Sequence, residues 1–267
     1  MLTQAKNIAL VSAAISRYWA RYFSCRRFPD GQLYYVVYTE ADDAIPYQAS
    51  VGNYWTINLH LMASTLRIAD QITAASFANV RRAYLGMASE AKAAWREAPT
   101  IMPRFDLPCG GPLRLTQSLL KPINCSPSLH AAVPFFLYNM AVRYRPEEAP
   151  RLASYVGEVV STVLRTKLHA MIDIAFGMLL AKNAVEEMGF LFHDPYQQRL
   201  DGIPYEQAYR HYRAVKDSKA PLPLVMKRYF QKIGLPQVRR EDSACFYEVE
   251  TATLHYLPGS RNGRGLF

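Results

Sequence analysis

Cysteine and glycine are both scarce in this sequence of 267 residues, which contains four cysteines and 13 glycines. The cysteines, at positions 25, 109, 125 and 245, form no C-x-x-C pair, so neither a disulfide scaffold nor a zinc site built from them is expected. The 13 glycines and 17 prolines follow no period, which excludes a collagen-like or low-complexity chain. Half of the residues are apolar, which is enough hydrophobic material to order most of the chain.

Long apolar runs are also absent. A membrane-spanning helix needs about 20 predominantly apolar residues, and the longest uncharged stretch, 45–66, is interrupted by polar residues such as Gln48 and Asn53. The N-terminal run Ile8–Ile15 is similar to the core of a signal peptide, but no A-x-A cleavage site follows it. Its apolar residues recur at helical spacing, so we expect an amphipathic helix over 3–24. We predict a cytoplasmic protein and leave peripheral membrane contact open.

The charge is unbalanced toward basic residues, with 31 Lys and Arg against 22 Asp and Glu, a formal net charge of +9. Such a balance suits nucleic acid, an anionic membrane surface or an anionic substrate. The basic residues occur only as short, scattered pairs such as Arg26-Arg27, and no nucleic-acid-binding motif is present. We therefore expect an anionic substrate and no nucleic acid.

Apolar residues recur every three to four positions through most of residues 48–192, a pattern typical of helices. The expected helices cover 48–66, 69–95, 130–144, 148–168 and 168–191, followed by 203–216 and 221–233. Pro99, Pro103, Pro108 and Pro112 predict a long loop over 99–128. The predicted fold is mainly α, a bundle of about five or six helices with small irregular or β segments at the termini.

Two segments rich in aromatic and β-branched residues, 33–39 and 245–256, are candidate strands, and whether they pair is left open. We divide the chain into an N-terminal helix with a short extended segment (1–44), a helical core (45–194) and a C-terminal extension packed on that core (195–267).

The first motif with chemical potential is N-C-S-P-S-L-H, which ends at His130 and opens an apolar helix. Pro127 suits a first helical turn, and Ser126 is a candidate N-cap. His130 would then lie in the first turn, where free backbone N–H groups and the helix dipole attract phosphate. The alternative is a histidine that merely caps the helix.

The second motif is T-K-L-H-A-M-I-D, residues 166–173. On a helix, His169 and Asp173 would share one face. The carboxylate could then orient one imidazole nitrogen and leave the other free to attack an electrophile. A purely structural pair is the alternative, and a metal site is not expected because no third His or Cys has suitable spacing.

Together, the two motifs resemble the type 2 phosphatidic acid phosphatase superfamily, which carries P-S-x-H and, further along, H-x-x-x-D. The branch that includes inositol phosphotransferases is the most similar, and P-T-I-M-P-R, residues 99–104, resembles its first conserved block. The resemblance covers about residues 45–182. It implies an acid phosphatase/haloperoxidase-like helical core and a phosphohydrolase or phosphotransferase that needs neither metal nor cofactor.

The resemblance also implies a role for each matching residue. His169 is the nucleophile that forms a phosphohistidine, Asp173 orients it, and His130 is the general acid for the leaving oxygen. Ser128 binds phosphate oxygens and Arg104 adds positive charge. The arginine that the family carries six residues before the nucleophile is Val163 here.

We choose Lys167 to replace that arginine, because in a single helix over 163–173 it would lie about 40° from position 163. The intervening helices carry many charged residues, unlike the membrane-embedded family members, so we expect a soluble or peripheral protein and a phosphate or diphosphate ester, with an amphiphilic one left open. The alternatives are a repurposed member, which processes prenyl diphosphates or is a vanadate-dependent haloperoxidase, and a degenerate protein that binds an anion or a partner.

Overall fold

Helices make up most of the computed structural model, which describes residues 32–48, 52–102, 124–195, 205–241, 245–248 and 253–256, together with five single residues before position 21. The bundle consists of α3 (Gly52–Gln71), α4 (Ala74–Glu97), α6 (Leu129–Tyr144), α7 (Ala149–Arg165) and α8 (Met171–Glu187). The shorter α9 (Tyr205–Val215) and α10 (Leu222–Lys232) pack against α8 and α4. Two short elements, α2 (Glu40–Asp43) and the 3-10 turn η1 (Pro146–Glu148), complete the helical part.

The helices α6 and α8 form the centre of the bundle. All residues from 129 to 141 in α6 and from 171 to 181 in α8 are buried. A helix that is buried on all sides carries apolar residues all round, whereas α7 has one apolar stripe and one polar face. The starts of the two central helices therefore lie inside the protein.

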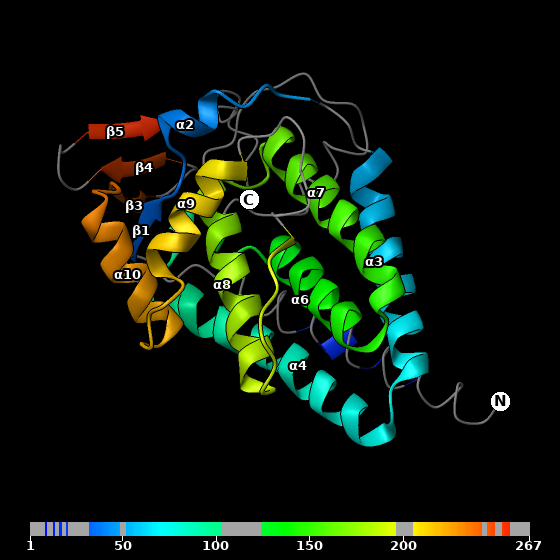
Figure 1. Cartoon of the computed structure of the whole chain (residues 1–267). Coiled ribbons are helices and arrows are strands. Elements are labelled where there is room, and N and C mark those ends of the chain that lie inside the picture. Colours follow the sequence, from blue (N-terminus) through cyan, green and yellow to red (C-terminus); the bar gives the residue numbers. More distant parts are fainter. Residues whose placement is uncertain are drawn as a thin grey trace.

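A small sheet lies at one end of the bundle, beside α9 and α10 (Figure 1). Its order is β2-β1-β3-β4-β5. The strands are β1 (Leu33–Val36), β2 (Thr100–Ile101), β3 (Gln237–Glu241), β4 (Cys245–Glu248) and β5 (Thr253–Tyr256). Only β1 and β2 run parallel, and the other neighbours are antiparallel.

The mainly α fold with small β segments is confirmed, and the expected helices lie within a few residues of the observed ones. The sheet differs in detail. In place of one strand over 245–256 there are two antiparallel strands, β4 and β5, and β3 lies between β4 and β1. Most of the predicted helix over 3–24 and most of the loop over 99–128 lie outside the described residues.

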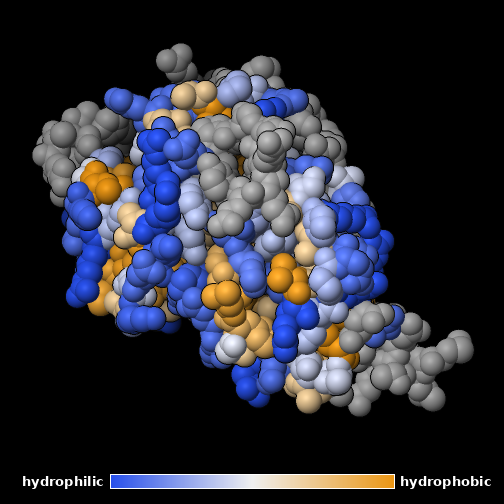
Figure 2. All heavy atoms as spheres, viewed as in Figure 1, coloured by the Kyte–Doolittle hydropathy of each residue, from blue (hydrophilic) through white to orange (hydrophobic). Residues whose placement is uncertain are grey.

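Among the described residues, no helix has both the length and the apolar character required to cross a bilayer. The face seen in Figure 2 is mostly hydrophilic and carries small, separate apolar patches.

Candidate active site

The two sequence motifs meet where α6 and α8 begin. Nδ1 of His130, in the first turn of α6, lies 3.0 Å from Nε2 of His169. The two rings are tilted by 58°, and their centroids are 5.2 Å apart. The backbone N–H of Ser128 donates to the carbonyl oxygen of Asp173 at 3.0 Å, which ties the two helix starts together. His130 and His169, 39 residues apart in the sequence, therefore lie side by side in the structure.

His169 and Asp173 are also in contact, with 3.3 Å between Nδ1 and Oδ2. The expected cause, a shared helical face, is wrong, because α7 ends at Arg165 and α8 begins at Met171. His169 lies in the linker between them, and Asp173 in the first turn of α8. Oδ2 of Asp173 also accepts the Ala170 N–H at 2.9 Å, so the carboxyl group both caps the helix and contacts the histidine.

The linker begins with a left-handed residue, Lys167, whose φ is 55°. The N–H of Leu168 donates to the Val163 carbonyl and that of Lys167 to the Leu164 carbonyl, the pair of bonds of a Schellman motif. This motif usually has glycine at the left-handed position. Helix α7 therefore stops without the usual sequence signal, and the single helix assumed over 163–173 does not exist.

The start of α6 differs from the prediction by two residues. Ser128, not Ser126, is the N-cap, and its Oγ accepts the Ala131 N–H at 3.3 Å. The Ser126–Pro127 peptide bond is cis. The N–H of Ser126 donates to Oγ1 of Thr100, which joins this turn to β2. The sheet thus helps to position the loop that carries Ser128 and His130.

Gly177 allows α8 to approach the first turn of α6. A Cβ atom at this position would lie 2.5 Å from the carbonyl oxygen of Ser128 and 2.9 Å from Cβ of Ala131. Real side chains do not make such contacts, so only glycine fits here. The short distance between the two histidines depends on this close packing.

Burial controls the protonation of the cluster. Desolvation, assisted by the neighbouring His169, lowers the pKa of His130 to about 3, so this ring is neutral at pH 7. Burial raises the pKa of Asp173 to about 8, although the hydrogen bond from the Ala170 N–H and the nearby Ser126 side chain oppose the shift. Assigned from these contacts, His169 donates from Nδ1 to Asp173 and accepts at Nε2 from Nδ1 of His130.

Two residues outside both motifs hold the linker in place, and the sequence analysis did not identify them. Oδ1 of Asp42 accepts the Met171 N–H at 2.8 Å, and its carbonyl oxygen accepts from Nζ of Lys167. Nζ of Lys167 also contacts the hydroxyl of Tyr38 at 3.2 Å. The signal for Asp42 was present as T-x-x-D, residues 39–42, the pattern of a capping box.

The remaining candidate residues stand as follows. Among the described residues, the Lys167 ammonium donates to Tyr38 and Asp42. The single helix over 163–173 from which Lys167 was chosen is absent, so that geometric reason is wrong, and its role as a phosphate ligand remains a prediction. Arg104 lies outside the described residues. The described part of the chain contains no group of three or more His, Cys, Asp or Glu arranged to hold a metal ion.

Comparisons with known proteins give no further guidance: no family model, no curated protein and no solved structure matches this chain. The functional argument therefore depends on the two motifs and on the geometry of the site.

Proposed function

We propose that this chain is a metal-independent phosphohydrolase or phosphotransferase that acts on a phosphate or diphosphate ester through a phosphohistidine on Nε2 of His169. The observation that carries the proposal is the contact chain from Asp173 through His169 to His130, with distances of 3.3 and 3.0 Å. It joins residues from two separate motifs in the order of orienting carboxyl group, nucleophile and general acid, which nucleophilic transfer requires.

In the first step, the Nε2 lone pair of His169 attacks phosphorus, an N–P bond forms and the bond to the leaving oxygen breaks. The imidazole becomes cationic once phosphorus is attached, and the carboxylate of Asp173 beside Nδ1 compensates that charge. This compensation favours ionised Asp173 at the moment of transfer, although burial favours its neutral form in the free protein.

His130 supplies the proton that the leaving oxygen takes up. Its lowered pKa makes it a weak base in the free protein, and a phosphate dianion beside the ring raises that pKa because opposite charges favour the protonated form. In the second step, water or an alcohol attacks phosphorus, the N–P bond breaks, and His130 accepts the proton of the nucleophile. The inward-facing N-termini of α6 and α8 attract anionic phosphate oxygens.

The test is phosphate release by purified protein, prepared without detergent and with a chelator present. The panel contains p-nitrophenyl phosphate, a short-chain phosphatidic acid, and the mono- and diphosphates of geraniol and farnesol. We expect chelator-resistant release that His169→Ala reduces by about a thousandfold or more, since the nucleophile is lost. His60→Ala, at an exposed histidine of α3, is the matched control and should retain activity.

Acid-labile, base-stable labelling of the protein by a radiolabelled substrate identifies the phosphohistidine directly. No release from any substrate, together with no labelling, would overturn the proposal. Binding of vanadate without turnover would then direct attention to a repurposed or anion-binding member of the same superfamily.

A further inference from the structure

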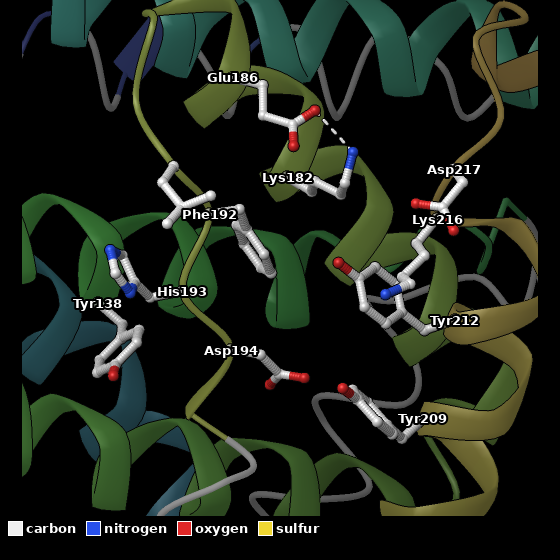
Figure 3. A pocket seen from close by; sticks show the side chains of 11 residues that line it. Tyr138, Lys182, Glu186, Phe192, His193, Asp194, Tyr209, Tyr212, Lys216 and Asp217 are labelled. Carbon is white, nitrogen blue, oxygen red and sulfur yellow. Dashed lines mark hydrogen bonds and ion pairs between the residues drawn. The ribbon is translucent and has the colours of Figure 1, made fainter.

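A cavity lies away from His130 and His169, between α6, α8, the segment 191–194 and the end of α9 (Figure 3). Its volume is about 580 Å³, enough for a small organic molecule. Tyr138 in its wall follows His130 by eight residues on α6, which is about 12 Å along the helix axis. The cavity is therefore a separate site from the phosphoryl-transfer centre.

Aromatic rings form much of the wall. Tyr138 comes from α6, Phe192 from the segment after α8, and Tyr209 and Tyr212 from α9. The rings of Phe192 and Tyr212 are 6.3 Å apart, and those of Tyr209 and Tyr212 are 5.8 Å apart. The Tyr209 ring already stacks with a cation, because Cζ of Arg213 lies 4.7 Å from its centroid. Aromatic walls of this kind bind organic cations through the ring quadrupole.

Negative charge accompanies the rings. The lining contains three carboxylates and two lysines, and Lys182 and Glu186 neutralise each other at 2.6 Å, which leaves Asp194 and Asp217 against Lys216. In Figure 3 the carboxylate of Asp194 lies between the rings of Tyr138 and Tyr209. The last turns of α8 and α9 lie at the same place, and helix C-termini carry partial negative charge.

The tyrosine hydroxyls respond to this field. Burial raises the pKa of Tyr212, and the charges of Asp194, Glu186 and Asp217 raise it further. Burial and Asp194 likewise raise the pKa of Tyr138. A negative potential that disfavours a phenolate favours a bound cation.

The wall is held in shape by Asn139 of α6. Its Oδ1 accepts the His193 N–H at 2.6 Å, and its Nδ2 donates to the His193 carbonyl at 3.0 Å. The same Nδ2 donates to the Phe135 carbonyl within the helix. Phe192 and Asp194, on either side of His193, are thereby fixed against the bundle, so the cavity is formed before any ligand arrives.

We propose that this cavity is a binding site for a small organic cation, such as the ammonium group of an amine, held by Asp194 and the rings of Tyr209 and Tyr212. The proposal goes beyond the phosphoryl transfer inferred above and does not depend on it.

Binding of three probes of similar size to the full chain tests the charge preference, by calorimetry and by saturation-transfer NMR. Benzylamine is cationic at neutral pH, benzyl alcohol is neutral and phenylacetate is anionic. We expect benzylamine to bind at least about tenfold more tightly than the other two. Equal or tighter binding of benzyl alcohol or phenylacetate overturns the proposal, and so does the absence of benzylamine binding at about 10 mM.

Two variants locate the site. Asp194→Asn and Tyr209→Leu should each weaken benzylamine binding about tenfold. Asp194→Asn should affect the binding of benzyl alcohol less, because this probe carries no charge. Glu186→Gln, at a side chain that is 41% exposed, provides a charge variant that leaves the core undisturbed. Asp70→Asn, at an exposed acid on α3, is the control. Asp194→Asn or Tyr209→Leu is compared if it folds. If benzylamine binds as tightly to that variant and to Glu186→Gln as to the wild type, the amine binds elsewhere and the proposal is overturned.

Discussion

Asp173 performs two tasks with one oxygen atom. Its Oδ2 accepts the Ala170 N–H at the start of α8 and contacts Nδ1 of His169 in the preceding linker. The side chain is fully buried, which raises its pKa to about 8. A group that caps a helix and also holds the proposed nucleophile is rigid, because moving it for one purpose disturbs the other.

The titration of Asp173 should be visible in the stability of the protein. The carboxyl group titrates near 3.8 when unfolded and about 8 when folded, so the folded state holds the extra proton between these values. The stability that this proton contributes is complete at low pH and is lost as pH rises through 8. We expect the unfolding free energy of the wild type, relative to Asp173→Asn, to fall by about 1 kcal/mol per pH unit in this window.

Denaturant titrations at several pH values measure that difference. The comparison of the wild type with Asp70→Asn, on the surface of α3, provides the baseline. A difference between wild type and Asp173→Asn that is independent of pH would contradict the raised pKa.

A variant of Lys167 can distinguish a structural role of this side chain from a phosphate-binding role. Its side chain is 7% exposed, and its ammonium contacts Tyr38 and Asp42. We expect Lys167→Met to cost about 1–3 kcal/mol of unfolding free energy, because buried partners lose a charged donor. The kcat/KM of the folded variant should stay within about threefold of the wild type. A rise in KM of about tenfold or more with unchanged stability would instead support a phosphate ligand.

The residue types and spacing in the two motifs predicted His130, His169 and Asp173 as candidate site residues, but not all of the geometry that brings them together. The left-handed backbone at Lys167 could not be predicted, because neither glycine nor asparagine marks it. Asp42 belongs to α2, far from α8 in the sequence, and only the fold brings it to the start of α8.

At the scale of elements, the site depends on the packing of α6 against α8. Gly177 of α8 faces the start of α6 so closely that an added Cβ would lie 2.5 Å from the Ser128 carbonyl oxygen. A helix pair at this separation leaves no room for even a methyl group.

Gly177→Ala should therefore destabilise the protein, by about 1–3 kcal/mol, and reduce phosphate release by at least tenfold. The added Cβ pushes the two helix starts apart and lengthens the contact between the histidines. Gly86→Ala is the matched control, since a Cβ at this position of α4 meets nothing within 4 Å. It should raise stability by about 0.5–1 kcal/mol, as alanine favours helix. Thermal unfolding and the release assay on both variants decide the point.

Long elements rich in apolar residues were predicted well, and short polar ones were missed. The helices of the bundle are long and apolar, whether striped like α7 or apolar all round like α6 and α8, and their bounds differ by no more than five residues from those expected. Strand β3, Q-V-R-R-E, has little apolar alternation. Its extended conformation depends on pairing with the neighbouring strands β1 and β4, which the sequence alone does not show.

At the scale of the whole molecule, the C-terminal segment is joined to the core through Phe230 of α10. This side chain is fully buried and packs 5.1 Å from the Tyr35 ring of β1 and 5.3 Å from the Phe176 ring of α8. It therefore connects the sheet, the extension and one of the two central helices.

We expect Phe230→Ala to lower the unfolding free energy by about 3–5 kcal/mol, since it leaves a cavity between three elements. Leu224→Ala, on the same helix at a residue 38% exposed, should change it by less than about 1 kcal/mol. Denaturant unfolding followed by circular dichroism compares the two. Similar small losses for both variants would show that the extension contributes little to the core.

The place of β3 in the sheet has a consequence for synthesis on the ribosome. β1 pairs with β3, with Tyr35 opposite Gln237, so its principal partner emerges only after the bundle helices have been translated. Until then Tyr34 and Tyr35, both buried in the finished protein, face solvent on a strand whose other neighbour is two residues long. Exposed strand edges promote association between chains. The nascent protein is therefore most prone to aggregate late in translation, when a chaperone that covers the β1 segment is of greatest use.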